Sequence, residues 1–151
     1  HLNDQLNQLF GKGSITLTDR GFIHTPSGMI LDTVADTSSN IDAFIQFGRL
    51  RAASLKDIAA HKASALCSRE EIKDLVDIAF LTKQMRWTLS DLAEFAQEKF
   101  RLGTITEEKL LTELLAKQAL SIPSSMFLHS GEQFQREVHE QVTRLIQTTT
   151  I

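Results

Sequence analysis

The residues best suited to chemistry lie in one block of this sequence, SLKDIAAHKASALCSREEIKDLVDIAFL, from Ser54 to Leu81. A lysine, Lys62, precedes two acids, Asp74 and Asp77, that lie three residues apart. Residues three apart on a helix project from the same face. The block is typical of two helices joined by a short polar turn. The residue types alone therefore predict a charged cluster where the two helices meet.

This cluster has two interpretations. Lys62, Arg69, Lys73, Asp74 and Asp77 could form surface ion pairs of small energetic value, since charge runs are usually solvated faces. Alternatively, the two acids border the apolar stripe of the second helix, and groups at the edge of such a stripe can face a cleft. That predicted stripe consists of Leu75, Ile78, Ala79 and Leu81.

A further carboxylate, Asp32, follows apolar residues in GMILDTVAD. It could be an ordinary aspartate at the end of a strand. It could also be a metal ligand held on a rigid strand, where an oxygen donor suits Mg²⁺. A site that holds divalent ions for phosphoryl chemistry usually has several clustered carboxylates, so one aspartate does not suffice.

Other short motifs have simpler interpretations. GKGS at 11–14 lacks the order and the strand–helix setting of a phosphate-binding loop, and we expect a helix end and a turn. The five histidines share no metal-ligand spacing, and Cys67 is the single cysteine. We expect Cys67 to be packed rather than nucleophilic. We expect Trp87 to pack against the helical hairpin rather than to stack on a base.

The elements that must position these residues follow from periodicity and turn chemistry. Residues 2–10 predict a short amphipathic helix that ends at the GKG sequence. Residues 14–35 change to a period near two, with turns at 19–21 and 26–28, and predict two or three short antiparallel strands. A polar loop at 36–40 and a further strand within 44–50 complete this region.

Everything after residue 53 is expected to be helical. Capping signals predict the helix starts, and they are Ser54 with Asp57, Ser68 with Glu71, Thr88 or Ser90, and Thr106 with Glu108. A last amphipathic helix is expected from about 130 to 147. The sequence thus predicts an α+β fold, in which a small antiparallel or mixed sheet (1–53) precedes a helical bundle (54–151) and packs with it as one domain.

Composition limits the function classes. A chain of 151 residues suits one domain, and 42% hydrophobic and 23% charged residues are ordinary for a globular protein. The net charge of −3 gives no overall attraction for nucleic acid, so any such contact must come from a local patch. No apolar run reaches the roughly 18 residues of a membrane helix.

The polar N-terminus lacks the basic and then apolar pattern of a signal peptide. A single cysteine excludes an internal disulfide and fits a reducing cytoplasm. Because the sequence starts with His1, we expect it to be part of a longer protein.

The order of charges, with Lys62, then Arg69, then Lys73-Asp74-x-x-Asp77 before an apolar run, resembles the AbiEii/AbiGii-like nucleotidyltransferases. These are toxin components of abortive-infection toxin–antitoxin pairs. The resemblance extends over nearly the whole chain, but the block from 62 to 77 is its specific part. It implies that residues 1–53 are part of a nucleotidyltransferase sheet. The family's G-S and D-x-D motif is absent from this sequence, so the chain alone is expected to be inactive.

The resemblance also implies roles. Lys62 would contact a nucleotide phosphate, with Arg69 and Lys73 assisting in nucleotide binding, while Asp74 and Asp77 would assist catalysis. Asp32 would be the family's third carboxylate, a ligand of Mg²⁺. We therefore expect Lys62, Asp74 and Asp77 to share a cleft with Asp32. The implied partners are an NTP, an RNA or protein acceptor and an antitoxin. The alternative is a non-catalytic helical protein-binding module on the same scaffold.

Overall fold

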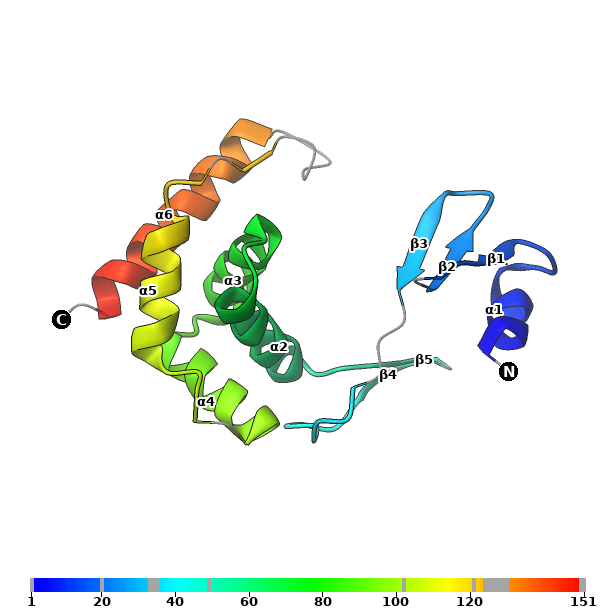
Figure 1. The fold of residues 1–151 in the computed structure, drawn as a ribbon, viewed down its shortest axis with the longest axis horizontal. Coiled ribbons are helices and arrows are strands. Elements are labelled where there is room, and N and C mark those ends of the chain that lie inside the picture. Colours follow the sequence, from blue (N-terminus) through cyan, green and yellow to red (C-terminus); the bar gives the residue numbers. More distant parts are fainter. Residues whose placement is uncertain are drawn as a thin grey trace. The chain divides into compact units, whose positions relative to one another are not determined.

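The structure is a computed structural model that describes residues 2–19, 21–32, 36–48, 50–101, 103–120, 122–123 and 131–149. It divides into two compact units, His1–Thr37 and Ser38–Ile151. Two small antiparallel sheets precede a bundle of helices (Figure 1). The predicted α+β fold, a small sheet region followed by helices, is confirmed.

The first unit contains one helix and a three-stranded meander. Its elements are α1 (Leu2–Phe10), β1 (Ile15–Leu17), β2 (Gly21–His24) and β3 (Met29–Asp32), with the strands in the order β1-β2-β3. The predicted stop after α1 is confirmed, since Gly11 has φ +101° and donates its N–H to the carbonyl of Asn7. A positive φ is easy for glycine because it has no Cβ. The predicted turn at 26–28 joins β2 to β3.

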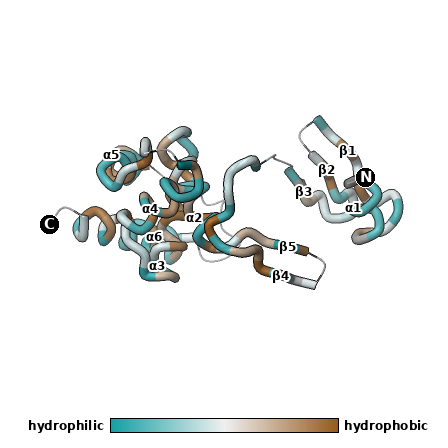
Figure 2. The backbone as a smooth tube through the Cα atoms, turned by 90° about the horizontal axis from the view of Figure 1, so that it is seen from below, coloured by the Kyte–Doolittle hydropathy of each residue, from teal (hydrophilic) through white to brown (hydrophobic). Residues whose placement is uncertain are grey.

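The second unit begins with a two-stranded hairpin and continues as helices. Its elements are β4 (Ile45–Phe47), β5 (Leu50–Ala52), α2 (Leu55–Ser68), α3 (Ile72–Met85), α4 (Leu89–Phe100), α5 (Glu107–Lys117) and α6 (Gly131–Thr149). Hydropathy along the backbone alternates within the helices, as expected of amphipathic segments that share a core (Figure 2). The hairpin of β4 and β5 belongs to this second unit, since the compact division falls after Thr37. The packing of the whole chain as one domain stays a prediction.

Local capping chemistry sets most helix starts. The side chains of Ser54, Thr88 and Thr106 each accept a hydrogen bond from the backbone N–H three residues later, which confirms these predicted caps. The predicted cap at Ser68 with Glu71 is wrong. Helix α2 continues through Ser68, whose hydroxyl donates to the carbonyl of Ala65, and α3 begins only after Glu71 without a side-chain cap.

The core lies between the helices of the second unit. In α6 the predicted stripe is confirmed, because Val138, Val142 and Leu145 are buried and Phe134 packs against them. Full burial of one such side chain contributes roughly 1.5–3 kcal/mol. The largest completely buried aliphatic side chains from the other helices are Leu66, Leu75, Ile78, Leu89, Leu92, Leu110 and Leu114. In the described part of the chain, no helix has the length and apolarity needed to cross a membrane.

A buried ion pair joins α2, α4 and the loop before β4. The ammonium of Lys99 lies 2.8 Å from the Asp57 carboxylate, and both side chains are 1% exposed. Ser54 donates its hydroxyl to the same carboxylate at 2.5 Å, and the backbone N–H of Ile41 donates at 3.0 Å. Burial alone would raise the pKa of Asp57, but the hydrogen bonds from Lys99, from Ser54 and from the backbone of residues 41 and 42 lower it to about 2.

Candidate functional site

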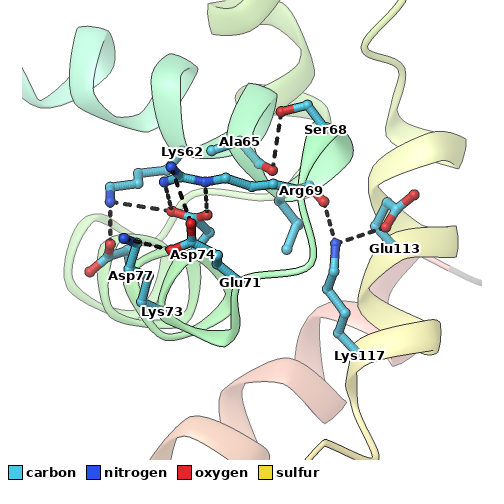
Figure 3. Close-up of polar contacts among 11 residues, drawn as sticks. Lys62, Ala65, Ser68, Arg69, Glu71, Lys73, Asp74, Asp77, Glu113 and Lys117 are labelled. Atoms are coloured by element: carbon cyan, nitrogen blue, oxygen red, sulfur yellow. Dashed lines mark hydrogen bonds and ion pairs between the residues drawn. The ribbon is translucent and has the colours of Figure 1, made fainter. Parts of the chain in front are cut away.

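Three of the predicted site residues meet where α2 and α3 pack together (Figure 3). The Lys62 ammonium lies 2.5 Å from a carboxylate oxygen of Asp77 and 3.4 Å from one of Asp74. Lys62 projects from the middle of α2, whereas both aspartates lie on one face of the first half of α3. The predicted convergence of Lys62, Asp74 and Asp77 is therefore confirmed.

Asp74 forms the buried centre of this cluster, with a side chain that is 0% exposed. Arg69 binds it in a bidentate manner, with Nε donating to one oxygen at 2.7 Å and Nη2 to the other at 2.9 Å. Burial would raise the pKa of Asp74, but the hydrogen bonds and charge of Arg69, and then those of Lys62, lower it overall. Asp74 thus stays ionised and forms ion pairs with Arg69 and Lys62. These ion pairs hold the end of α2 against α3.

Lys62 and Asp77 are more accessible, with side chains 26% and 43% exposed. Burial would lower the pKa of Lys62, but the hydrogen bond and charge of Asp77, and then those of Asp74, raise it overall. Lys62 is consequently protonated at neutral pH. It is suited to act as a fixed positive charge rather than as a general base.

The turn between the helices holds the remaining predicted cations. Arg69 joins the cluster through Asp74, and its side chain is 43% exposed. Lys73 instead pairs with Glu71 at 2.6 Å, and Arg69 lies 3.7 Å from the same carboxylate. The structure therefore brings Arg69 to the cluster and gives Lys73 a partner in the turn. Glu71, which the sequence indicated as part of a helix cap, is an ion-pair partner.

Lys117 supports the end of α2 from the neighbouring helix α5 (Figure 3). Its buried ammonium donates to the carbonyl of Leu66 and pairs with Glu113 at 2.8 Å. A cation at the C-terminal end of a helix is favoured because the last carbonyls have no partner within the helix. Sequence reasoning missed this residue, because no local pattern connects Lys117 to α2.

An open hollow lies along α2 beside the cluster, with a volume of about 320 Å³. That volume is at the lower end of the range for small-ligand pockets. Its charged side chains are cations, Lys62 and Arg69, and two serine hydroxyls, Ser64 and Ser68, also line it. His61, also in the lining, packs its ring against Phe100 at 5.2 Å. The sequence analysis did not place either serine at a site, although their four-residue spacing on α2 puts them on one face.

Asp32 is the last residue of β3, opposite Gly21 on β2. Asp32 belongs to the first unit, whereas Lys62 on α2 belongs to the second. A cleft shared by Asp32 and Lys62 therefore stays a prediction. Among the described residues, no group of three or more histidine, cysteine, aspartate or glutamate side chains could hold a metal ion. Asp74 and Asp77 direct their carboxylates to cations. The described residues therefore do not by themselves fit a Mg²⁺ site.

Cys67, near the turn between α2 and α3, and Trp87, beyond the other end of α3, are both packed against the core. Cys67 is partly buried against the core, and burial raises the pKa of its thiol, which disfavours a reactive thiolate. The ring of Trp87 meets that of Phe95 edge to face, with centroids 4.9 Å apart. Both observations fit structural roles for Cys67 and Trp87.

The fold and the cluster define an α+β protein with a charged helical hairpin, in which two cations held by carboxylates line a hollow. Comparison of the chain with models of protein families, with curated proteins and with solved structures gives no match. The resemblance to AbiEii/AbiGii-like nucleotidyltransferases thus stays a prediction that rests on the residues from 62 to 77.

Proposed function

We propose that this chain is part of a nucleotidyltransferase-like protein that transfers a nucleotidyl group from an NTP to an RNA or protein acceptor. In this proposal it acts as the toxin of a toxin–antitoxin pair in the cytoplasm. The observation that carries the proposal is that Lys62 and Arg69, both held by carboxylates, line the same hollow. Preorganised cations are the means by which proteins bind and stabilise transferring phosphoryl groups.

Each residue of the cluster has a distinct role in this proposal. Lys62 is the phosphate-directed charge, because it remains protonated and reaches the hollow. Asp77 positions the Lys62 ammonium through their 2.5 Å contact. Asp74 is a positioning residue rather than a group that touches substrate, because it is buried and bound by Arg69. Arg69 offers further donors to an anion beyond the two that Asp74 accepts.

Metal chemistry would need residues beyond those described. Divalent ions on a triphosphate are usually held by several carboxylates, and β3 supplies Asp32 alone. In the proposal, the other ligands come from a G-S and D-x-D segment of a longer parent protein. We therefore expect this chain alone to transfer no label from radioactive NTP to RNA or protein in the presence of Mg²⁺. A labelled product formed by the purified chain would contradict this part of the proposal.

In this proposal the main test uses the longer parent protein, which would contain the G-S and D-x-D segment. Lys62→Ala should reduce transfer by about 10²–10³-fold, the usual effect of removing one electrostatic contact to the reacting groups. The variant should fold normally, because alanine is a good helix former and Lys62 lies in the middle of α2. Asp77→Asn should also reduce transfer, since it removes the charge that positions Lys62 at nearly constant volume.

Lys83→Ala is the matched control. Lys83 forms a comparable exposed ion pair between helices, 2.7 Å from Glu137, but it lies outside the hollow. Its loss should leave transfer unchanged, and thermal unfolding should be normal for all three variants. Full activity of Lys62→Ala, or an equal loss in Lys83→Ala, would refute the proposed site.

A second candidate function is a non-catalytic protein-binding module. It is favoured by a small apolar hollow between α3 and α6, where Phe80 is 54% exposed beside Phe134 and Val138. Exposed apolar surface of this kind can mark a contact with another protein. If the module is correct, cells expressing the parent protein should show the same growth effect after Lys62→Ala and lose it after Phe80→Ala. The opposite pattern favours the enzyme.

A further inference from the structure

A second polar hollow lies at the other end of α3 from the charged hairpin. It forms where α3 ends and α4 begins, against the C-terminal half of α6. Its lining consists of Thr82, Arg86, Trp87, Thr88, Gln141, Arg144, Leu145 and Thr148. Arg86 follows Asp74 by twelve residues, which corresponds to about 18 Å along a helix. The two hollows are therefore separate sites.

The charge of this hollow is entirely positive. Its lining includes Arg86 and Arg144 and contains no acidic residue. Within the described part of the chain, neither guanidinium has an ion pair or a hydrogen bond. Lys62 and Arg69 at the hairpin, by contrast, each bind a carboxylate. In a chain of net charge −3, two cations without carboxylate partners form a local site for an anion.

Asp91, three residues after Thr88 of the lining, already has hydrogen-bond partners. Asp91 lies in the first turn of α4 and accepts hydrogen bonds from the backbone N–H and the hydroxyl of Thr88, at 2.7 and 2.8 Å. These contacts form a capping box that fixes the start of α4. Asp91 thus directs its carboxylate toward the helix cap rather than toward either arginine.

The other polar groups of the hollow also have defined roles. Thr82 donates its hydroxyl to the carbonyl of Ile78 at 2.7 Å and accepts from buried Gln141 at 3.1 Å. Thr148 donates to the carbonyl of Arg144 at 3.0 Å. The donors that remain are the two guanidinium groups and the indole N–H of Trp87, which has no acceptor among the described residues. A lining that offers donors and few acceptors is suited to an anion.

The chemistry and the size together indicate which anion fits. Guanidinium groups bind phosphate oxygens in planar pairs of hydrogen bonds, so they are well suited to phosphate. The hollow has a volume of about 90 Å³. This is several times the roughly 15 Å³ that a single water needs, so the hollow has room for a group larger than water, such as one phosphate.

We propose that Arg86, Arg144 and Trp87 bind one phosphate group, supplied either by a small phosphate compound or by the backbone of a nucleic acid. The site is independent of the proposed nucleotidyl transfer, since it shares no residue with the hairpin hollow. A backbone phosphate held here would fix the position of an RNA strand on the helical unit. Because both arginines are exposed, binding is expected to weaken as the salt concentration rises.

Trp87 provides a direct assay. It is the only tryptophan, and the chain has no tyrosine, so intrinsic emission reports this residue. The full chain is titrated with inorganic phosphate, and separately with a short single-stranded RNA, at constant ionic strength. We expect a saturable change in emission and a shift of the indole N–H resonance in NMR spectra. Arg86→Gln and Arg144→Gln should each weaken binding at least about tenfold, the loss expected for one charge-assisted hydrogen bond.

Two arginines serve as matched controls. Arg101 ends α4 with φ +53°, the same left-handed conformation that Arg86 (φ +59°) adopts at the end of α3. Arg136 lies on α6 with Arg144 but outside the hollow. Arg101→Gln and Arg136→Gln should therefore bind like the unmodified chain.

The outcomes separate the two sources of phosphate. Saturation by inorganic phosphate alone supports a small phosphate compound. Tighter binding of RNA, with an affinity that falls linearly on a log–log plot against salt, supports a backbone phosphate. Absence of a saturable change in both signals with both probes would overturn the proposal, as would an equal loss of binding in the control variants. None of these readouts depends on nucleotidyl transfer, so failure here is distinguishable from failure of the proposed enzyme.

Discussion

Lys99→Met should destabilise the protein strongly through the carboxylate that it leaves behind. The Lys99 ammonium lies 2.8 Å from Asp57, and both side chains are 1% exposed. Methionine preserves the length and the packing of the side chain but removes its charge. Asp57 would then keep only its neutral donors, among them the hydroxyl of Ser54 and the backbone N–H of Ile41.

The pKa of Asp57 gives the scale of the effect. A fall from 3.8 to about 2 corresponds to about 2 kcal/mol of stability at neutral pH. Removing one partner of a buried pair typically costs about 3–5 kcal/mol, because the remaining charge is uncompensated. We therefore expect Lys99→Met to lower the free energy of unfolding by about 3 kcal/mol at pH 7. The double variant with Asp57→Asn should lose less than Lys99→Met alone.

The pH dependence follows from the lowered pKa. Asp57 contributes its stability above pH 3.8, and this contribution is lost as the pH falls toward 2 and the folded state binds a proton. The difference between the original chain and Lys99→Met should accordingly shrink below about pH 4. Urea unfolding followed by circular dichroism at several pH values measures this difference.

Lys56→Met is the matched control. Lys56 precedes Asp57 and forms an exposed pair with Asp42 at 3.5 Å, which should contribute less than about 1 kcal/mol. Equal losses in Lys56→Met and Lys99→Met would refute the reasoning. A loss in Lys99→Met that stays constant down to pH 2 would do the same, since it would show that the charge of Asp57 is not involved.

Two further variants test how the hairpin is held together. Asp74→Asn should cost about 1.5–3 kcal/mol in chemical unfolding, the usual value of hydrogen bonds to a charged group, because the cations left behind, Arg69 and Lys62, are partly exposed. Asp77→Asn should cost less than about 1 kcal/mol. Equal costs would show that burial does not distinguish the two aspartates. Lys117→Met should cost about 1–3 kcal/mol, because the carbonyl of Leu66 loses a charged donor, and hydrogen exchange should then speed up selectively in the last turn of α2. Uniform exchange throughout the helices would contradict that local role.

Local signals in the sequence identified much of what the structure contains. The caps at Ser54, Thr88 and Thr106 involve groups three residues apart, so the sequence alone places them. The cluster of Lys62 with Asp74 and Asp77 could also be predicted from the sequence, because a short turn makes two consecutive helices neighbours. The cap at Ser68 failed because two local outcomes compete there. Because α2 continues through Ser68, the Ser68 hydroxyl donates to the carbonyl of Ala65 and does not cap α3.

The buried polar contacts needed the tertiary structure. Lys99 and Asp57 lie 42 residues apart, and Lys117 and the Leu66 carbonyl 51 apart. Arg86 and Arg144 share a hollow only because α6 packs beside the junction of α3 and α4. Hydrophobic periodicity states which face of a helix is buried, but it does not state which helix covers that face or at what rotation. Local geometry fixes contacts within a turn of chain, whereas the partners of distant charges depend on how whole helices pack.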